Sequence, residues 1–425
     1  MIFLLIVPLV LGLYALVHWY LWRRLVRDVS VPGGRWRRTG TVLAAALPLL
    51  GLGALVGGRL LPLSAERWLA WPGYLWLATL IYLMLALFAG EVVRAVWLRL
   101  PARASRVAVP ADAARWRPGD ESPGPDPAPV LEREALPEPG AEKKEQAGPG
   151  DPSRRLFVAR TVAIGAAGVA AAVVGTGAYG VLNGPSLKQV TVPLAKLPRR
   201  AHGYRIAVVS DIHLGPILGR SHTRRIVDTI NATQPDLIAI VGDLVDGTVP
   251  ELGPAAVPLA DLRARDGAYF VTGNHEYFSG ARPWVEFVRS LGIQPLENAR
   301  TELPWFDLAG VNDLAGESYG EGPDFGRALG DRDRSRAAVL LAHQPVNIHD
   351  AVRHGVDLQL SGHTHGGQLW PGNLIAELAN PTVAGLERYG DTQLYVTRGA
   401  GAWGPPVRVG APSDITVLTL ASPAA

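Results

Sequence analysis

Five short apolar runs in the second half of this 425-residue chain each end directly at side chains that can bind metal ions. Runs of this kind are typical of parallel strands that are buried on both faces of a sheet. The first run, Ile206 to Val209, leads to Asp211 and His213. Side chains two residues apart in extended backbone point to the same side, so this pair can share one cation. The recurrence of the pattern predicts one site at the carboxyl ends of several strands.

The later runs add carboxylates, a carboxamide and more imidazoles. We expect strands over 190–194, 204–210, 237–241, 268–272, 338–342, 356–360 and 415–420, and a helix over 221–234. The side chains that follow these runs are Asp243, Asp246, Asn274, His275, Glu276, His343, His363 and His365. A single histidine of this kind is more often a structural residue, but five strand ends with metal-type ligands favour a shared site.

Composition excludes several classes of function. The chain contains no cysteine, so it has no disulfides, no thiolate zinc sites and no cysteine nucleophile. Its 41 Lys and Arg against 38 Asp and Glu give a formal net charge of +3. Because many arginines flank apolar segments instead of forming a basic patch with interleaved aromatic residues, we expect no nucleic-acid partner and no nuclease.

Three apolar stretches in residues 1–100, at 2–22, 41–58 and 70–93, are long enough to cross the roughly 30 Å hydrocarbon core of a bilayer. The first could be a signal peptide, but it lacks a basic amino-terminal region and a clear cleavage site, which favours an uncleaved helix. The third begins just after Trp68 and contains Trp71, Tyr74 and Trp76, aromatic residues typical of a membrane interface. Residues 1–100 are therefore predicted to be a membrane region with three transmembrane helices.

The distribution of arginines predicts the topology. Six arginines between residues 23 and 38 follow the first stretch, whereas only Arg59 and Arg67 separate the second stretch from the third. The positive-inside rule places the first connection in the cytoplasm and the amino terminus outside. Residues 101–153 are rich in Pro, Gly and mixed charge, so we expect a disordered cytoplasmic linker.

A fourth apolar stretch, 161–182, follows the sequence SRRLFVAR at Ser153–Arg160. The paired arginines resemble a twin-arginine export signal. The alternative is a pair of positive-inside anchors, and both alternatives give the same topology. Residues 154–183 are predicted to be the fourth transmembrane helix, which makes this a multi-pass cell-membrane protein with residues 184–425 outside the cytoplasm.

The blocks SDIH, GDLVD, GNHE, LLAHQP and GHTHGG resemble the five-block signature of the calcineurin-like metallophosphoesterases. The longer stretches GNHEYFSG and GHTHGGQLWPGN are similar to the bacterial branch that is membrane-attached or exported. The resemblance covers about residues 200–420, and all five blocks are intact. It implies an α/β fold, a four-layer αββα sandwich over residues 184–425, preceded by the helical transmembrane region.

The resemblance also implies a role for each strand-end residue. Two divalent ions, Mn, Fe, Zn or Co, would be held by Asp211, His213 and His365 at the first position, by Asn274, His343 and His363 at the second, and by Asp243 at both. His275, next to a ligand, would face the substrate as general acid or charge stabiliser. Asp246 would contact the metal-binding side chains without itself binding a metal ion.

Such a centre suits the hydrolysis of phosphomonoesters or phosphodiesters. Largely neutral ligands leave two cations able to lower the pKa of a bridging water, and the resulting hydroxide can attack phosphorus in line. Arg398 is a further candidate, as a phosphate ligand. Membrane anchoring suggests a lipid or cell-envelope substrate but is also compatible with soluble nucleotides. The alternative function is a non-catalytic membrane sensor or scaffold, which the intact ligand set disfavours.

Overall fold

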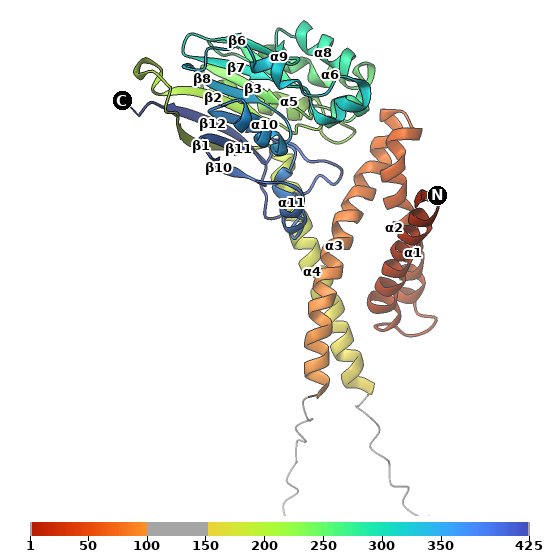
Figure 1. The fold of residues 1–425 in the computed structure, drawn as a ribbon. Helices are drawn as coiled ribbons and strands as arrows, with labels where there is room; N and C mark the ends of the chain where they lie inside the picture. Colours follow the sequence, from red (N-terminus) through yellow and green to blue (C-terminus); the bar gives the residue numbers. More distant parts are fainter. Residues whose placement is uncertain (1, 100–151, 424–425) are drawn as a thin grey trace, which may run out of the picture.

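Two six-stranded sheets pack face to face in the second half of the chain (Figure 1). The structure, a computed structural model, describes residues 2–99 and 152–423. The first sheet has the order β1 (Ser186–Pro193), β12 (Asp414–Ala421), β2 (Tyr204–Val209), β3 (Leu237–Val241), β4 (Ala268–Val271), β5 (Gln294–Pro295). The second has the order β10 (Gly385–Tyr389), β11 (Thr392–Val396), β9 (Leu358–Ser361), β8 (Ala337–Leu341), β7 (Phe306–Gly310), β6 (Ala299–Glu302).

The strands that lead to the site are parallel to one another within each sheet. β2, β3, β4 and β5 run parallel in the first sheet, and β7, β8, β9 and β11 run parallel in the second. The predicted strands are confirmed to within about two residues at most ends, and the predicted strand 190–194 overlaps an edge strand, Ser186–Pro193, that begins earlier. The carboxyl ends of two parallel sets can therefore meet at one place.

Alternate side chains of the central strands enter different cores. In β2, Ile206 and Val208 pack between the two sheets, whereas Ala207 and Val209 pack against the outer helices. Because both faces of β2 are buried, its residues 206–209 are all apolar and do not alternate between apolar and polar. The helices on the first sheet are α5 (Arg220–Ala232), α6 (Val249–Ala256) and α8 (Ala281–Ser290), and those on the second are α9 (Phe325–Leu329) and α10 (Ile348–Arg353). The four-layer αββα sandwich is thus confirmed.

Shorter helical segments connect these layers. Two of them are the α-helices α7 (Asn274–Ser279) and α11 (Gly372–Ala379). The 3-10 segments are Arg199–Ala201, Val257–Asp261, Leu314–Tyr319, Pro345–Asn347 and His365–Gly367. A five-residue π-helical segment, Arg23–Arg27, follows α1 in the first half.

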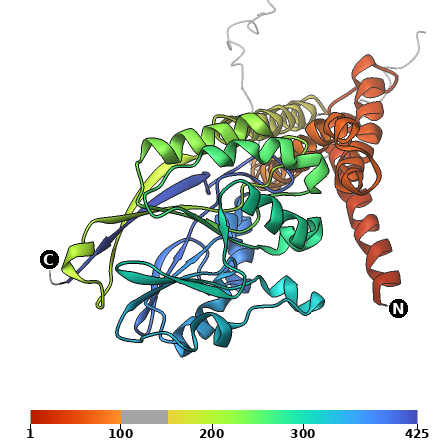
Figure 2. The ribbon, with the colours of Figure 1, turned by 90° about the horizontal axis from the view of Figure 1, so that it is seen from above.

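In the described part of the first half, four helices are long and apolar enough to cross a membrane. They are α1 (Ile2–Trp22), α2 (Arg35–Leu60), α3 (Leu63–Arg99) and α4 (Pro152–Leu182). Each contains one of the predicted apolar stretches, and α4 begins slightly before the predicted residue 154. Nearly all of the predicted linker 101–153 lies outside the described residues. Figure 1 shows α3 and α4 crossing, and Figure 2 shows the helices at one side of the sandwich.

The two halves of the chain are in direct contact. Val407, in the loop between β11 and β12, is fully buried in an apolar cluster with Leu83 of α3 and Ala170 of α4. The backbone N–H of Arg408 donates a hydrogen bond to the carbonyl of Gly177 in α4, with an N–O distance of 3.3 Å. The loop after β11 therefore links the sheets to the transmembrane helices.

Candidate metal centre

The structure brings all of the predicted ligands together, and they come from both sheets. Asp211 and His213 follow β2, Asp243 follows β3, and Asn274 and His275 open α7 directly after β4. From the second sheet, His343 follows β8, and His363 and His365 follow β9. Of eight non-glycine residues with positive φ among the described residues, five are in this set, namely Asp211, His213, Asp243, His363 and His365. Such backbone strain is concentrated at functional sites.

One group of donor atoms surrounds Asp211. His213 Nε2 and His365 Nε2 face each other at 3.0 Å, and His365 Nε2 lies 3.3 Å from Asp211 Oδ1. His213 Nε2 is 4.0 Å from Asp211 Oδ1 and 3.8 Å from Asp243 Oδ2. Two nitrogens bound at right angles to one ion at about 2.1 Å would be roughly 3 Å apart. The spacing of this group therefore fits a divalent cation.

A second group of donor atoms lies on the other side of Asp243. His343 Nε2 is 3.1 Å from Asp243 Oδ2, and the rings of His343 and His363 are 5.1 Å apart. His363 Nδ1 lies 3.0 Å from the side-chain oxygen of Asn274. Asp243 Oδ2 is thus within 4 Å of a histidine nitrogen in each group. This is the position in which one carboxylate could serve two cations.

Outer hydrogen bonds fix the proton positions on two histidines. His213 donates from Nδ1 to Asp246 Oδ1 at 2.8 Å, and His343 donates from Nδ1 to the carbonyl of Val241 at 2.8 Å. In the neutral form both rings therefore present an unprotonated Nε2 to the centre. His343 Nε2 is buried without a hydrogen-bond partner while it faces Asp243. A lone pair that faces a carboxylate requires a proton or a cation between them, so these residues fit metal ions.

The electrostatics of the centre also fit bound metal ions. Burial lowers the pKa of His213, but the carboxylates of Asp246 and Asp243 outweigh it and raise the pKa to about 9. Burial also lowers the pKa of His343, and Asp243 raises it well above the usual value. Without another cation, the carboxylates thus hold protons on buried histidines. Divalent ions could supply the same positive charge and release these protons.

Asp246 holds two histidines with one oxygen atom. Its Oδ1 lies 2.8 Å from Nδ1 of His213 and 2.8 Å from Nδ1 of His275. The rings of His213 and His275 meet edge to face with their centroids 4.7 Å apart. The predicted supporting position of Asp246 agrees with this geometry, which couples a candidate ligand to the candidate general acid.

Two supporting residues were not assigned a role from the sequence. The fully buried carboxylate of Glu276 accepts backbone hydrogen bonds from Gly273, Asp243 and Leu244, and so ties the ends of β3 and β4 together. Arg408 donates from Nη1 to the carbonyl of His365 at 3.0 Å, and its Nη2 lies 3.1 Å from Nδ1 of the same residue. The strand-to-helix position of Glu276 was a usable signal, whereas nothing in the local sequence indicates Arg408.

The predicted phosphate ligand Arg398 lies elsewhere. It lines a smaller cavity with Gly366, Trp370 and Glu377, and is not among the residues that line the cavity at the metal centre.

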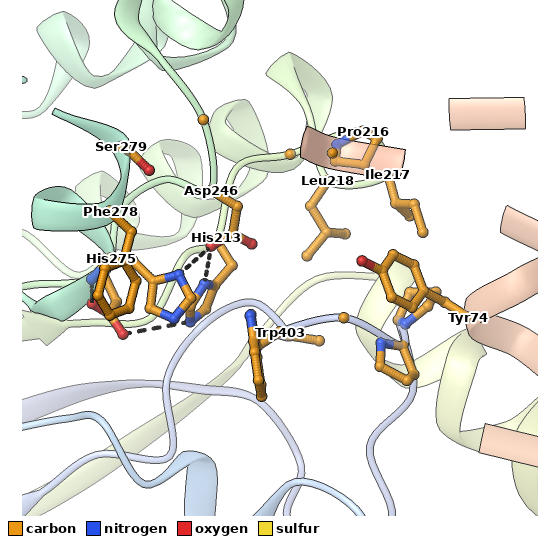
Figure 3. Close-up of a pocket in the computed structure, with 18 of the residues that line it drawn as sticks. Tyr74, His213, Pro216, Ile217, Leu218, Asp246, His275, Phe278, Ser279 and Trp403 are labelled. Carbon is orange, nitrogen blue, oxygen red and sulfur yellow. Dashed lines mark hydrogen bonds and ion pairs between the residues drawn. The ribbon is translucent and has the colours of Figure 1, made fainter. Parts of the chain in front are cut away.

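A cavity of about 790 Å³ opens from the centre. His213, His275 and His365 lie at one end, together with Asp243 and Asp246. Figure 3 shows His213, His275 and Asp246 on one side, Trp403 and Leu218 beyond them, and Tyr74 of α3 opposite. The walls therefore come from the sandwich and from the transmembrane helices.

Comparisons with known proteins find relatives in the metallophosphoesterase family. The calcineurin-like phosphoesterase family model matches residues 204–367. A Danio rerio protein named transmembrane protein with metallophosphoesterase domain is 42% identical over 259 residues, which are 57% of this chain and 59% of that protein. An uncharacterised metallophosphoesterase of Aquifex aeolicus is 33% identical over 251 residues, 57% of this chain and 95% of its own length. The structure of a dimetal phosphatase from Danio rerio matches with a TM-score of 0.33 and 14% identity, over 50% of this chain and 91% of that one.

Proposed function

We propose that this chain, which belongs to the calcineurin-like metallophosphoesterase family, is a membrane-anchored hydrolase of phosphomonoesters or phosphodiesters that uses two divalent metal ions. The observation that supports this best is the position of Asp243, whose Oδ2 lies 3.8 Å from Nε2 of His213 on one side and 3.1 Å from Nε2 of His343 on the other. A single bound ion would leave one of these groups without a cation.

In the proposed assignment, Asp211, His213 and His365 hold one ion, Asn274, His343 and His363 hold the other, and Asp243 contacts both. When bound, the ions would neutralise phosphate charge and activate water. In hydrolysis a water oxygen adds to phosphorus, the P–O bond to the leaving group breaks, and the leaving alkoxide takes up a proton.

His275 is the proposed donor of that proton. It lines the cavity, and its Nδ1 is held by Asp246 at 2.8 Å, which leaves Nε2 as the proton-transfer atom. Its backbone N–H donates to Asp243 Oδ1 at 2.9 Å, so the position of His275 depends on the bridging carboxylate. The preceding residue, Asn274, points in a different direction from His275, because the side-chain oxygen of Asn274 lies next to Nδ1 of His363.

We also propose that the amino terminus and residues 184–425 lie outside the cytoplasm and that 101–153 are cytoplasmic. The support is the arginine asymmetry around the four apolar helices. An alkaline phosphatase reporter fused after Ala425 should be active in cells, whereas a fluorescent reporter that needs the cytoplasm should be dark there. The reverse pattern would invert the topology.

The function is tested on the purified full chain by metal content and hydrolysis together. Wild-type protein loaded with Mn²⁺ or Zn²⁺ should bind two ions and hydrolyse 4-nitrophenyl phosphate or bis(4-nitrophenyl) phosphate. Asp243→Asn should lose ions from both groups, whereas Asp391→Asn, at an exposed turn, should retain both. One ion in the wild type, or two in Asp243→Asn, contradicts the assignment. Two ions without hydrolysis would favour the sensor or scaffold.

A further inference from the structure

The cavity at the metal centre has a second wall that the phosphoesterase blocks do not supply. Ala54, Leu55 and Glu66 of the α2–α3 hairpin line it, as does Tyr74 further along α3. These residues lie in α2 and α3 within the spans 35–58 and 63–96, which are apolar enough to cross a membrane. In Figure 1 the hairpin connection lies beside the sandwich. The site therefore faces helices that are expected to be in the bilayer.

The cavity has a polar end and an apolar end. Its polar end holds the histidines and carboxylates of the centre, and towards the hairpin it is lined by Ile217, Leu218 and Trp403 (Figure 3). Several large apolar side chains in it are exposed, with Leu55 at 57%, Phe278 at 71% and Trp403 at 59%. Exposed apolar surface that lines a concave site is typical of a site that binds an apolar ligand.

One loop joins this apolar end to the transmembrane helices. In the loop after β11, Trp403 lines the cavity, and Gly404 lies against the ring of Tyr74, since a Cβ there would be 3.6 Å from it. The same loop continues to Val407 and Val409, which pack with Val174 of α4. The apolar end of the cavity is therefore continuous with the packing of the membrane helices.

The neighbouring surface of the sandwich is also suited to a bilayer. Leu369 packs in the cluster that contains Val174, a residue of the span 155–182. α11 begins three residues later and leaves Leu374, Ile375 and Leu378 exposed, at 55%, 72% and 89%. Figure 1 shows α11 beside α4 on the side of the sandwich that faces the helices. A short helix with an exposed apolar face at this depth is typical of a membrane interface.

Glu66 restricts the charge of a ligand. Its side chain lines the cavity and is 8% exposed, and no hydrogen bond or ion pair is formed by it within the part of the chain that the structure describes. Glu251 lines the same region. The described residues that line the cavity include no Lys or Arg, while Glu66 and Glu251 do line it, so this end favours an uncharged chain over a polyphosphate.

We infer that the α2–α3 hairpin and the loop after β11 bind the apolar chain of an amphipathic phosphoester, so that the substrate class is a membrane lipid with a phosphate head group. This rests on the proposed function for the reacting phosphate. The phosphate would lie at the histidines and the chain along Leu55, Tyr74 and Trp403. The lipid would reach the site from the bilayer between the hairpin and the sandwich.

The inference is tested on the full chain in nanodiscs of phosphatidylcholine with hexadecyl phosphate and butyl phosphate, which share one reacting group. Leu55→Ser should lower the ratio of kcat/KM for hexadecyl over butyl phosphate about five- to tenfold, because it removes most of one leucine contact with the chain. Leu49→Ser is the matched control on the same helix, since Leu49 is 70% exposed and does not line the cavity. Its ratio should equal that of the wild type.

A binding measurement accompanies the kinetics. Hexadecylphosphonate with a diazirine at the chain end cannot be hydrolysed, and its crosslinks are mapped by mass spectrometry. They should fall on the segment 54–74 and on the loop around Trp403, and excess hexadecylphosphonate should remove them while butylphosphonate does not. Equal ratios in Leu55→Ser and Leu49→Ser, or crosslinks confined to other surfaces of the helices, would overturn the inference.

The two proposals fail in different ways. If the wild type hydrolyses both alkyl phosphates but Leu55→Ser leaves their ratio unchanged, the phosphoesterase stands and the lipid chain site is wrong. If crosslinks map to the hairpin but no phosphoester is hydrolysed, the chain site stands and the proposed hydrolysis is wrong.

Discussion

Asp246 offers the sharpest test of how the centre is built, because one carboxylate oxygen holds a candidate ligand and the candidate general acid. Asp246 Oδ1 lies 2.8 Å from Nδ1 of both His213 and His275. Asp246→Ala removes both contacts and leaves both rings free to turn. Asp246→Asn retains an acceptor oxygen but loses the charge that helps to raise the pKa of His213 to about 9, where burial alone would lower it.

The magnitude follows from the two roles. Loss of an outer partner of a metal-binding histidine typically costs 10- to 100-fold in metal affinity or activity, about 1.4 to 2.7 kcal/mol. Asp246→Ala should therefore weaken metal binding at the His213 position by roughly this factor. It should also lower kcat at saturating metal, because His275 is displaced as well. Asp246→Asn should lie between the wild type and Asp246→Ala on both measures.

The assay separates the two effects. Metal content is measured across a series of buffered Mn²⁺ concentrations, and hydrolysis of 4-nitrophenyl phosphate is measured where each variant is saturated. Asp391→Ala serves as the control, because Asp391 is fully exposed and only loosely paired with Arg388 at 3.6 Å. If Asp246→Ala binds Mn²⁺ like the wild type and turns over at the same rate, the coupling of His213 and His275 through Asp246 is wrong.

Three further substitutions test neighbouring parts of the site. His275→Ala should retain both ions but slow hydrolysis by roughly 10² to 10⁴, with a larger loss for alkyl than for nitrophenyl esters, whose leaving group needs little protonation; equal losses on both would exclude the general acid. Glu276→Gln should lower the free energy of unfolding by about 1 to 3 kcal/mol in chemical denaturation, because an amide cannot accept all three backbone N–H groups of Gly273, Asp243 and Leu244; unchanged unfolding would contradict this. Gly362→Ala should reduce metal content, since a Cβ there would overlap Asp211 Oδ2. Elemental analysis that finds the wild-type number of metal ions in this variant would contradict the expectation.

The strands and the grouping of the candidate ligands could be predicted from sequence because both are specified locally. β3 has the predicted bounds, Leu237–Val241, since its five apolar residues are all buried and are followed at once by a glycine and Asp243. The ligand types could be identified because short polar blocks directly follow such runs. The division into two sheets was expected only from the resemblance, since nothing within β8 or β9 distinguishes them from β2 or β3.

Arg398 and Arg408 illustrate where local sequence fails. Both lie in the glycine-rich loop after β11, ten residues apart, and both precede the predicted strand 415–420. Only the folded loop determines that Arg408 is buried and donates to His365 while Arg398 lines a different cavity. A guanidinium reaches its partner through long-range packing, which a pattern of neighbouring residues does not record.

The hairpin wall of the cavity is a stronger case of the same limit. A transmembrane helix is apolar on every side because lipid and protein interiors both favour apolar side chains, so the sequence of α2 does not distinguish the face at Leu55 from the face at Leu49. The short sequence blocks that contain the histidines are sufficient to identify the end of the cavity that would bind the phosphate. The other end is formed by residues more than 300 positions away from Trp403, which only the fold brings beside it. Relatives with the same blocks but different membrane helices should therefore share the reacting group and differ in the rest of the substrate.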